Sequence, residues 1–172
     1  MPRIEFIVTI RASMDALIEL LQKDALMPRE DIARLLDLSL DEVNTEIARL
    51  EKDGVILGYQ AIVNREKWGT DLVTAVIEVK VTPERGGGFD QIASRLAKFD
   101  EVKTCYLMSG GYDLLVIVEA ENLRAIAGFV AEKLSTLGVV QASASHFRLK
   151  TYKENGAFHQ FDQAPERLQV SP

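Results

Sequence analysis

The chain has 172 residues, of which 47% are hydrophobic, so it can bury a core as one domain or as two small ones. Its single cysteine, Cys105, excludes an intramolecular disulfide, and Cys105 with His146 and His159 makes no zinc-binding pattern. No apolar run approaches the roughly 18 residues that span a bilayer, so we expect a cytoplasmic protein that is not inserted in a membrane. We also expect no bound metal and no cofactor.

The whole chain has a net charge of -6, and its acidic residues are concentrated in the first third. Residues 1–60 contain 7 lysine and arginine residues against 12 aspartate and glutamate residues, whereas residues 61–153 contain 12 against 11. Nonspecific binding to DNA depends on clustered positive charge. We therefore expect weak sequence-independent affinity for DNA at physiological salt.

Three helical patterns are predicted at the start of the chain. Residues 4–12 permit either a strand or the start of a helix that continues into the next apolar residues, and we favour the helix. Pro28 suits the first position of a second helix. Ser39 and Glu42 form an S-x-x-E capping box that opens a third helix, which we expect to end near Gly54. The tight turn before Ser39 makes the last two helices typical of a helix-turn-helix.

A second region follows a strand-like stretch and a polar linker. Residues 55–64 are rich in β-branched residues and predict a short strand, whereas residues 64–71 predict a linker or a turn. From residue 73 to residue 81 apolar and polar side chains alternate, which indicates a strand with one buried face. We place a domain boundary near residue 66.

The remaining elements complete the order β-α-β-β-α-β. Helical spacing is found in residues 89–99 and 123–134, and strands are predicted at residues 102–108, 114–120 and 139–152. This order is the ferredoxin-like split βαβ arrangement. The predicted buried face of its second helix consists of Leu123, Ile126, Ala127, Val130 and Leu134.

The complete pattern resembles the Lrp/AsnC, or feast/famine, family of transcriptional regulators across residues 14–152. The resemblance rests on IARLLDLSLDEVNTEIARLEKDGVILGY, SGGYDLLVIVEAENL and EKLSTLGVVQASASHFRLKTYK, in this order. It implies an α+β chain in which an N-terminal winged helix-turn-helix is followed by a ferredoxin-like βαββαβ domain. We expect a DNA-binding part in residues 1–66, a ligand-sensing and oligomerisation part in residues 67–153, and a C-terminal tail in residues 154–172.

The resemblance also implies the binding partners of the chain. These are double-stranded DNA and a small-molecule effector, usually an amino acid in this family. The family further implies a homodimer formed through the ferredoxin-like domains, which assembles into a higher oligomer. Effector binding would change the relative placement of the DNA-binding parts. The predicted function is a sequence-specific transcriptional regulator that responds to a metabolite.

The candidate DNA contacts lie in the third helix. Asparagine can pair with adenine, arginine with guanine or a phosphate, and serine and threonine with bases or backbone. Residues 39–53 carry a net charge of -3, which departs from the several arginines usual in this helix of the family. The candidate residues are Ser39, Asn44, Thr45, Arg49 and Lys52.

The candidate effector site is the turn between the two middle strands. The family's usual pattern there is Gly-Asp, an aromatic residue and Asp, but Gly111 replaces the first carboxylate. Glycines permit positive φ and close backbone approach, while tyrosine and aspartate supply a hydroxyl and an acceptor. A plain hairpin turn between core strands is the alternative interpretation. The candidate residues are Met108, Ser109, Gly110, Gly111, Tyr112 and Asp113.

Two other functions are compatible with the sequence. The acidic third helix suits a metabolite-binding oligomeric protein whose DNA-binding domain is vestigial. A few proteins that look like this architecture decarboxylate tetrapyrroles. The sequence offers no acid–base pair for such chemistry, so we expect no enzyme activity and name no catalytic residue.

Overall fold

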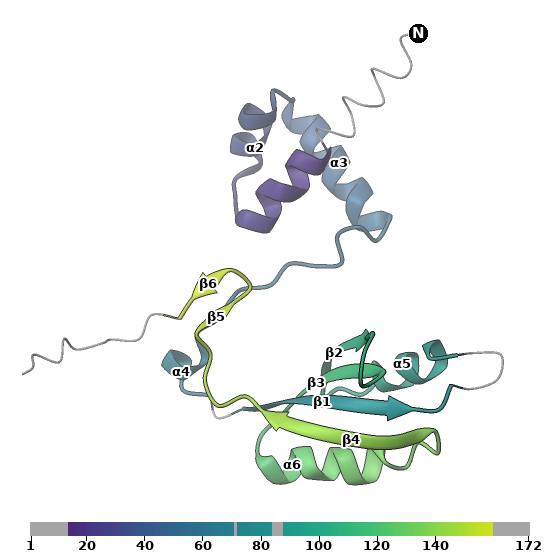
Figure 1. Ribbon diagram of the computed structural model, residues 1–172. Helices are drawn as coiled ribbons and strands as arrows, with labels where there is room; N and C mark the ends of the chain where they lie inside the picture. The colour runs from purple at the N-terminus through teal and green to yellow at the C-terminus, as the bar shows by residue number, and fades with distance from the viewer. Residues whose placement is uncertain (1–13, 71, 84–87, 160–172) are drawn as a thin grey trace, which may run out of the picture. The chain divides into compact units, whose positions relative to one another are not determined.

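The computed structural model describes residues 14–70, 72–83 and 88–159. It divides the chain into two compact units, Met1–Ala61 and Ile62–Pro172. Each unit has its own cluster of buried apolar side chains. The two units are therefore described one after the other (Figure 1).

The described part of the first unit contains three helices around a small apolar core. The first helix includes residues 14–23, and residues 4–12, for which the sequence favours a helix, lie outside the described residues. It is followed by α2 (Arg29–Leu36) and α3 (Leu40–Lys52). Pro28 is the N-cap of α2 and not its first residue as predicted, because its ψ of 136° is extended. The core consists of Leu17, Ile32, Ala33, Val43, Ile47 and Leu50.

The capping box predicted at the start of α3 is confirmed. The backbone N–H of Ser39 donates to Glu42 Oε2 at 2.8 Å, and that of Glu42 donates to Ser39 Oγ at 3.2 Å. Both bonds give partners to donors that a helix N-terminus leaves unpaired. Asp37 has a left-handed φ of 53° in the turn before α3, and Gly54 has a φ of 70° just beyond its end. The helix therefore begins and ends where the sequence predicts.

The strand predicted at residues 55–64 is wrong. All of these residues are described, and none of them is in a strand. Val55, Leu57 and Tyr59 are 55%, 93% and 50% exposed. A strand needs a neighbouring strand to bond its backbone, and the described part of the first unit offers none. The β-branched composition alone is therefore not sufficient to form a strand, and the segment has no regular structure.

The second unit is built on a four-stranded antiparallel sheet with the order β2-β3-β1-β4. This is the predicted ferredoxin-like order. The last strand ends at Phe147 and not at residue 152, because Phe147 pairs with Ala75 near the start of β1. The strands are β1 (Val73–Val81), β2 (Val102–Leu107), β3 (Leu114–Ala120) and β4 (Val140–Phe147).

Helices α5 (Asp90–Leu96) and α6 (Leu123–Gly128) supply the rest of this core. Figure 1 shows α6 running along the sheet beneath β1 and β4. The alternation predicted for β1 is confirmed, because its residues at odd-numbered positions from 75 to 81 are at most 4% exposed. They pack with Ile92, Leu96, Leu114, Val116, Val118, Ile126, Phe129, Leu134 and Leu137.

The predicted buried face of the second helix of this unit is partly wrong. Ile126 and Leu134 are buried as predicted, whereas Leu123 and Ala127 are exposed. The helix continues from α6 into a π-helical segment, Phe129–Leu134. A π-helix bonds each residue to the fifth residue along and is wider than an α-helix. Residues 129 and 134 are five positions apart and therefore reach the same core.

Three short elements lie in the segment that the sequence assigns to a linker and at the start of the predicted tail. Helix α4 (Arg65–Trp68) begins after Asn64, whose side chain accepts a hydrogen bond from the backbone of Lys67 at 3.1 Å. Strands β5 (Lys153–Glu154) and β6 (Ala157–Phe158) form a hairpin. Among the described residues, no helix is both long enough and apolar enough to cross a membrane.

Candidate DNA-binding and effector sites

Helix α3 presents a nearly neutral face to solvent. Its buried stripe consists of Val43, Ile47 and Leu50. On a helix of 3.6 residues per turn, the positions opposite that stripe are Asp41, Thr45, Ala48 and Lys52, and all four side chains are exposed. This outward face therefore carries one acidic and one basic residue, although the helix as a whole is acidic.

Other acidic residues of α3 lie on its flanks and are bound by neighbouring groups. Arg49 donates to Glu46 from Nε at 2.9 Å and from Nη2 at 2.6 Å. It also donates to Asp53 from Nη1 at 2.9 Å. The Tyr59 hydroxyl donates to Glu51 at 3.0 Å. The negative charge of these flanks is therefore partly compensated inside the first unit.

These contacts stabilise the charged forms of the groups involved. The hydrogen bond from Arg49 lowers the pKa of Glu46, and the bond from the backbone of Ser39 lowers the pKa of Glu42. The same pairing with Glu46 raises the pKa of Arg49. Glu42 also lies in the first turn of α3, where the helix dipole favours a negative charge. Its carboxylate therefore stabilises the helix that carries the candidate DNA contacts.

The five candidate DNA-binding residues differ in their availability. Thr45 and Lys52 are exposed on the outward face of α3. Ser39 is engaged in the capping box, and the side-chain oxygen of Asn44 accepts a hydrogen bond from Arg29, which lies on α2, at 2.7 Å. Arg49 is held by Glu46 and Asp53, so a base or a phosphate would compete with these carboxylates for its guanidinium.

The candidate effector residues form a tight turn between β2 and β3. The backbone N–H of Met108 donates to the carbonyl oxygen of Asp113 at 2.8 Å and closes the turn. Gly110 has a φ of 131°, a conformation that other residues rarely adopt. Ser109 and Gly111 are exposed, and Tyr112 is half-buried. The turn therefore presents a hydroxyl and backbone groups to solvent.

Asp113 has a structural role in the second unit. Its carboxylate oxygen Oδ2 accepts a hydrogen bond from the backbone of Val81 at 2.9 Å, and its own N–H donates to the carbonyl of Val79 at 3.0 Å. These bonds attach the turn to the end of β1. One carboxylate oxygen is already engaged, so it is mainly the other oxygen of Asp113 that can accept a hydrogen bond from a ligand.

The face of the sheet opposite the apolar core carries further apolar side chains. Val76 pairs with Ile117 across β1 and β3, and both are half-buried. Tyr106, which pairs with Leu115, is 56% exposed. Such a row of apolar side chains on an antiparallel sheet is typical of a face that packs against another surface.

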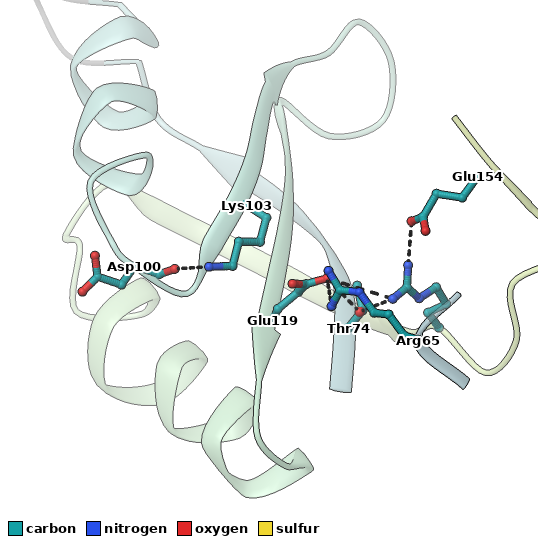
Figure 2. A network of polar contacts seen from close by, with 7 residues as sticks. Arg65, Thr74, Asp100, Lys103, Glu119 and Glu154 are labelled. Carbon is teal, nitrogen blue, oxygen red and sulfur yellow. Dashed lines mark hydrogen bonds and ion pairs between the residues drawn. The ribbon is translucent and has the colours of Figure 1, made fainter. Parts of the chain in front are cut away.

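A polar network at the other end of β1 was not predicted from the sequence. The guanidinium of Arg148 donates to Thr74 Oγ1 at 2.7 Å and to Glu154 at 3.0 Å. Arg65 Nη1 lies 2.8 Å from Glu119, and the Thr74 hydroxyl lies 3.4 Å from the same carboxylate. Figure 2 shows Arg65, Thr74 and Glu119 together at this end of the sheet, with Glu154 beside them. Only the fold brings these side chains together, because they are far apart in the sequence.

The described residues contain no group of three or more histidine, cysteine, aspartate or glutamate side chains that could hold a metal ion. Cys105 is half-buried in β2, and this burial raises the pKa of its thiol. A raised pKa disfavours the reactive thiolate form. The geometry around Cys105 therefore indicates a packing role.

Comparison with known proteins agrees with the division into two units. Residues 16–56 match the family described as winged helix-turn-helix DNA-binding, and residues 74–158 match the Lrp/AsnC ligand binding domain. Over 157 residues the chain is 42% identical to an uncharacterized HTH-type transcriptional regulator of Bacillus subtilis, covering 91% of this chain and 95% of that protein. The chain belongs to the Lrp/AsnC family of transcriptional regulators.

Further members of the Lrp/AsnC family align over most of the chain. The proline dehydrogenase transcriptional activator of Rhizobium radiobacter is 29% identical over 140 residues, which are 81% of this chain and 89% of that protein. The crystal structure of the leucine response regulatory protein of Mycobacterium tuberculosis superposes with a TM-score of 0.69 and 26% identity, covering 83% of this chain and 94% of that one.

These matches confirm the predicted fold class and the predicted class of function. The chain is a DNA-binding transcriptional regulator with a domain of the type that senses small metabolites such as amino acids. The acidic third helix suggests the alternative of a vestigial DNA-binding domain. This alternative is not favoured, because the relatives are named as a helix-turn-helix-type transcriptional regulator and a transcriptional activator.

Proposed function

We propose that this Lrp/AsnC regulator binds its DNA sites with the outward face of α3 in the major groove. The observation that supports this most directly is the compensation of the flanking acids, which leaves Thr45 and Lys52 on an almost neutral face. Thr45 would contact a base edge and Lys52 a phosphate. Ser39, Asn44 and Arg49 complete the proposed contact set at the flanks of the helix.

The proposed contacts include few phosphates, so each DNA-binding part binds weakly by itself. A dimer, or an assembly of dimers, overcomes this weakness because every contact after the first is intramolecular. We propose a homodimer that uses the sheet face around Val76 and Ile117 and assembles further into a higher oligomer. A regulator of this kind works where the chromosome lies, so the cytoplasm remains our proposed compartment.

Replacing Lys52 by Gln tests the proposed DNA-binding face. Titration of labelled duplex with the full-length variant at several salt concentrations should give a salt slope that is smaller by about 0.9 for each phosphate that the protein no longer neutralises. Lys98→Gln, which removes an exposed lysine of the second unit, is the matched control. Equal effects of both substitutions would remove the support for this face.

We propose an amino acid as the effector and the turn of residues 108–113 as its site. The turn offers the hydroxyls of Ser109 and Tyr112, the remaining oxygen of Asp113 and the backbone of Gly110 and Gly111. These groups suit an ammonium group and a carboxylate. The site differs from the family's usual pattern because Gly111 supplies no carboxylate, so we expect weaker binding of the ammonium group. We propose no catalytic step.

Binding of the twenty amino acids, tested one at a time by calorimetry, examines this proposal. We expect at least one of them to bind the wild type, and Ser109→Ala combined with Tyr112→Phe to weaken that binding. Thr136→Ser, at an exposed site of the second unit beyond this turn, is the control. A ligand that binds the double variant as tightly as the wild type would show that its site is elsewhere.

A further inference from the structure

A polar pocket lies beside the network of Arg148, at the end of β1 remote from the candidate effector turn. Its volume is about 120 Å³, and residues of α4, of the segment that follows α4, and of the chain between β4 and β6 line it. The residues that matter for its chemistry are Arg65, Thr70, Arg148, Lys150 and His159. All of them belong to the second unit.

Three residues that line this pocket have a buried side-chain atom without a hydrogen-bond partner among the described residues, and for two of them no ion pair replaces it. Thr70 Oγ1 and His159 Nδ1 are both buried, and neither has a hydrogen-bond partner among the residues that the structure describes. His159 is only 9% exposed. Buried polar groups are normally hydrogen-bonded, because an unpaired one has lost its bonds to water and gained none in return. A bound molecule that supplies the missing partners would remove this cost.

The backbone holds both of these residues in place. The N–H of Thr70 donates to the carbonyl of Arg65 at 3.3 Å, directly after the last turn of α4. The N–H of His159 donates to the carbonyl of Tyr152 at 3.0 Å, which closes the hairpin of β5 and β6. The positions of the two unpaired atoms are therefore set by the fold before any ligand binds.

The charge of the wall favours an anion. The lining residues include three cationic side chains, those of Arg65, Arg148 and Lys150, and two acidic ones, those of Glu66 and Glu154. One terminal nitrogen of Arg148 donates a hydrogen bond to Glu154 and the other donates one to Thr74. A guanidinium has five N–H donors, so three of them are not used in these two bonds. Arg65 Nη1 faces Glu119 without the geometry of a hydrogen bond. Donors of both guanidinium groups therefore remain for a ligand.

We propose that this pocket binds the carboxylate of a small metabolite, and that it is a ligand site separate from the turn of residues 108–113. Arg148 and Arg65 provide the positive charge, the Thr70 hydroxyl donates a hydrogen bond, and His159 donates from Nδ1 as the matching tautomer. Guanidinium groups bind carboxylates with good geometry. Hydroxyl and imidazole groups complete the set of donors.

The pocket has room for a group of a few heavy atoms. An apolar cavity of about 150 Å³ holds a benzene molecule, so a pocket of about 120 Å³ holds a slightly smaller one. Alanine, and propionate as the same molecule without its ammonium group, are suitable probes. An ammonium group would lie near Glu66 or Glu154, whereas a simple organic acid needs the carboxylate contacts alone.

The pocket and the effector turn lie at opposite ends of β1. Arg148 bonds Thr74 near the start of this strand, whereas Asp113 bonds Val81 at its end. The two positions are seven residues apart, which corresponds to about 23 Å along a strand. Binding in the pocket would join α4 to the hairpin of β5 and β6. Helix α4 directly follows the segment that comes from the DNA-binding unit, so this site is placed to influence that connection.

Calorimetric titration of the full-length protein with L-alanine and with propionate tests the inference, without any requirement for DNA binding. Thr70→Val removes the hydroxyl at nearly constant volume, and His159→Phe removes the ring nitrogens. Each variant should weaken binding about tenfold, as expected when one hydrogen bond to a charged group is removed. Thermal unfolding of each variant verifies that it is folded. The matched control is Thr136→Ser, at an exposed position outside both the pocket and the effector turn, which should leave this binding unchanged. Ser109→Ala is a further variant that distinguishes binding at the effector turn from binding in the pocket.

The possible results separate the two sites. Binding that is weakened by both pocket variants and not by Ser109→Ala supports the inference, and preference for alanine over propionate would then identify an amino acid as the ligand class. Binding that only Ser109→Ala weakens belongs to the proposed effector turn and overturns the inference. Failure of both probes to bind the wild type at concentrations of about 10 mM, where even weak sites with Kd near 1 mM fill, overturns it as well.

Discussion

Arg49 and Glu46 form a two-point ion pair on the flank of α3, with N–O distances of 2.9 and 2.6 Å. The same guanidinium reaches Asp53, four residues further along, at 2.9 Å. The most obvious DNA-binding cation of the helix is thus held by its own acidic neighbours. Exposed ion pairs of this kind are weak, so phosphate groups can compete with them.

Glu46→Gln should therefore increase the affinity for DNA. The substitution removes one negative charge and weakens the hold on Arg49, whose guanidinium then becomes available for a phosphate. We expect tighter binding and a salt slope that is steeper by about 0.9 if Arg49 then neutralises one phosphate. Glu30→Gln removes an exposed carboxylate from α2 and is the control. Unchanged affinity and slope in Glu46→Gln would exclude Arg49 as a DNA-binding residue.

Ser39→Ala should destabilise the first unit. The substitution removes the side-chain half of the capping box, and the loss of an N-cap costs about 1 kcal/mol. Ser39→Thr keeps the hydroxyl and should retain most of that stability. The single tryptophan, Trp68, lies in the second unit, so urea unfolding of the first unit should be followed by circular dichroism. Equal stability of the alanine and threonine variants would contradict the role of the cap.

Asp113→Ala should destabilise the second unit even in the absence of any effector. The carboxylate accepts a hydrogen bond from the backbone of Val81, and bonds to charged groups contribute about 1.5–3 kcal/mol. Asp113→Asn keeps an acceptor and should lose less. Unfolding followed by the fluorescence of Trp68 measures the difference. Wild-type stability of Asp113→Ala would mean that this residue serves the effector alone.

Ile117→Lys should prevent dimerisation. The side chain lies on the sheet face opposite the core, next to Val76, and a lysine there would place a charge in the proposed interface. Leu123→Lys puts the same charge on an exposed apolar position of α6 and is the control. Sedimentation velocity should show a monomer for the first variant and the wild-type assembly for the second. A wild-type assembly for both would mean that the dimer uses another surface.

Local patterns in the sequence predict the elements that depend on local physics. The capping box at Ser39, the tight turn just before it and the alternation along β1 are each recognisable within a few residues, and each is confirmed. The same patterns fail where a distant partner decides the outcome. Residues 55–64 have the composition of a strand but pair with no strand among the described residues.

The sequence predicts the candidate residues of α3 better than it predicts the polar network around Arg148. The sequence indicates which residues of α3 have suitable chemistry, but the pairing of Arg49 with two acids and the bond from Arg29 to Asn44 require side-chain geometry. Arg148 and Thr74 are 74 residues apart in the chain. No periodic pattern connects two such residues, so the network and the pocket beside it become visible only in the folded unit.

This acidic regulator binds specific DNA, we propose, through few phosphate contacts. Fluorescence anisotropy of the DNA upstream of its own gene, titrated with pure protein at low and at physiological salt beside an unrelated duplex, tests it most directly. We predict a preference for the upstream DNA that survives physiological salt, because base contacts depend on salt less than phosphate contacts do. Equal binding to both duplexes that disappears at physiological salt, or no binding at all, would contradict the claim.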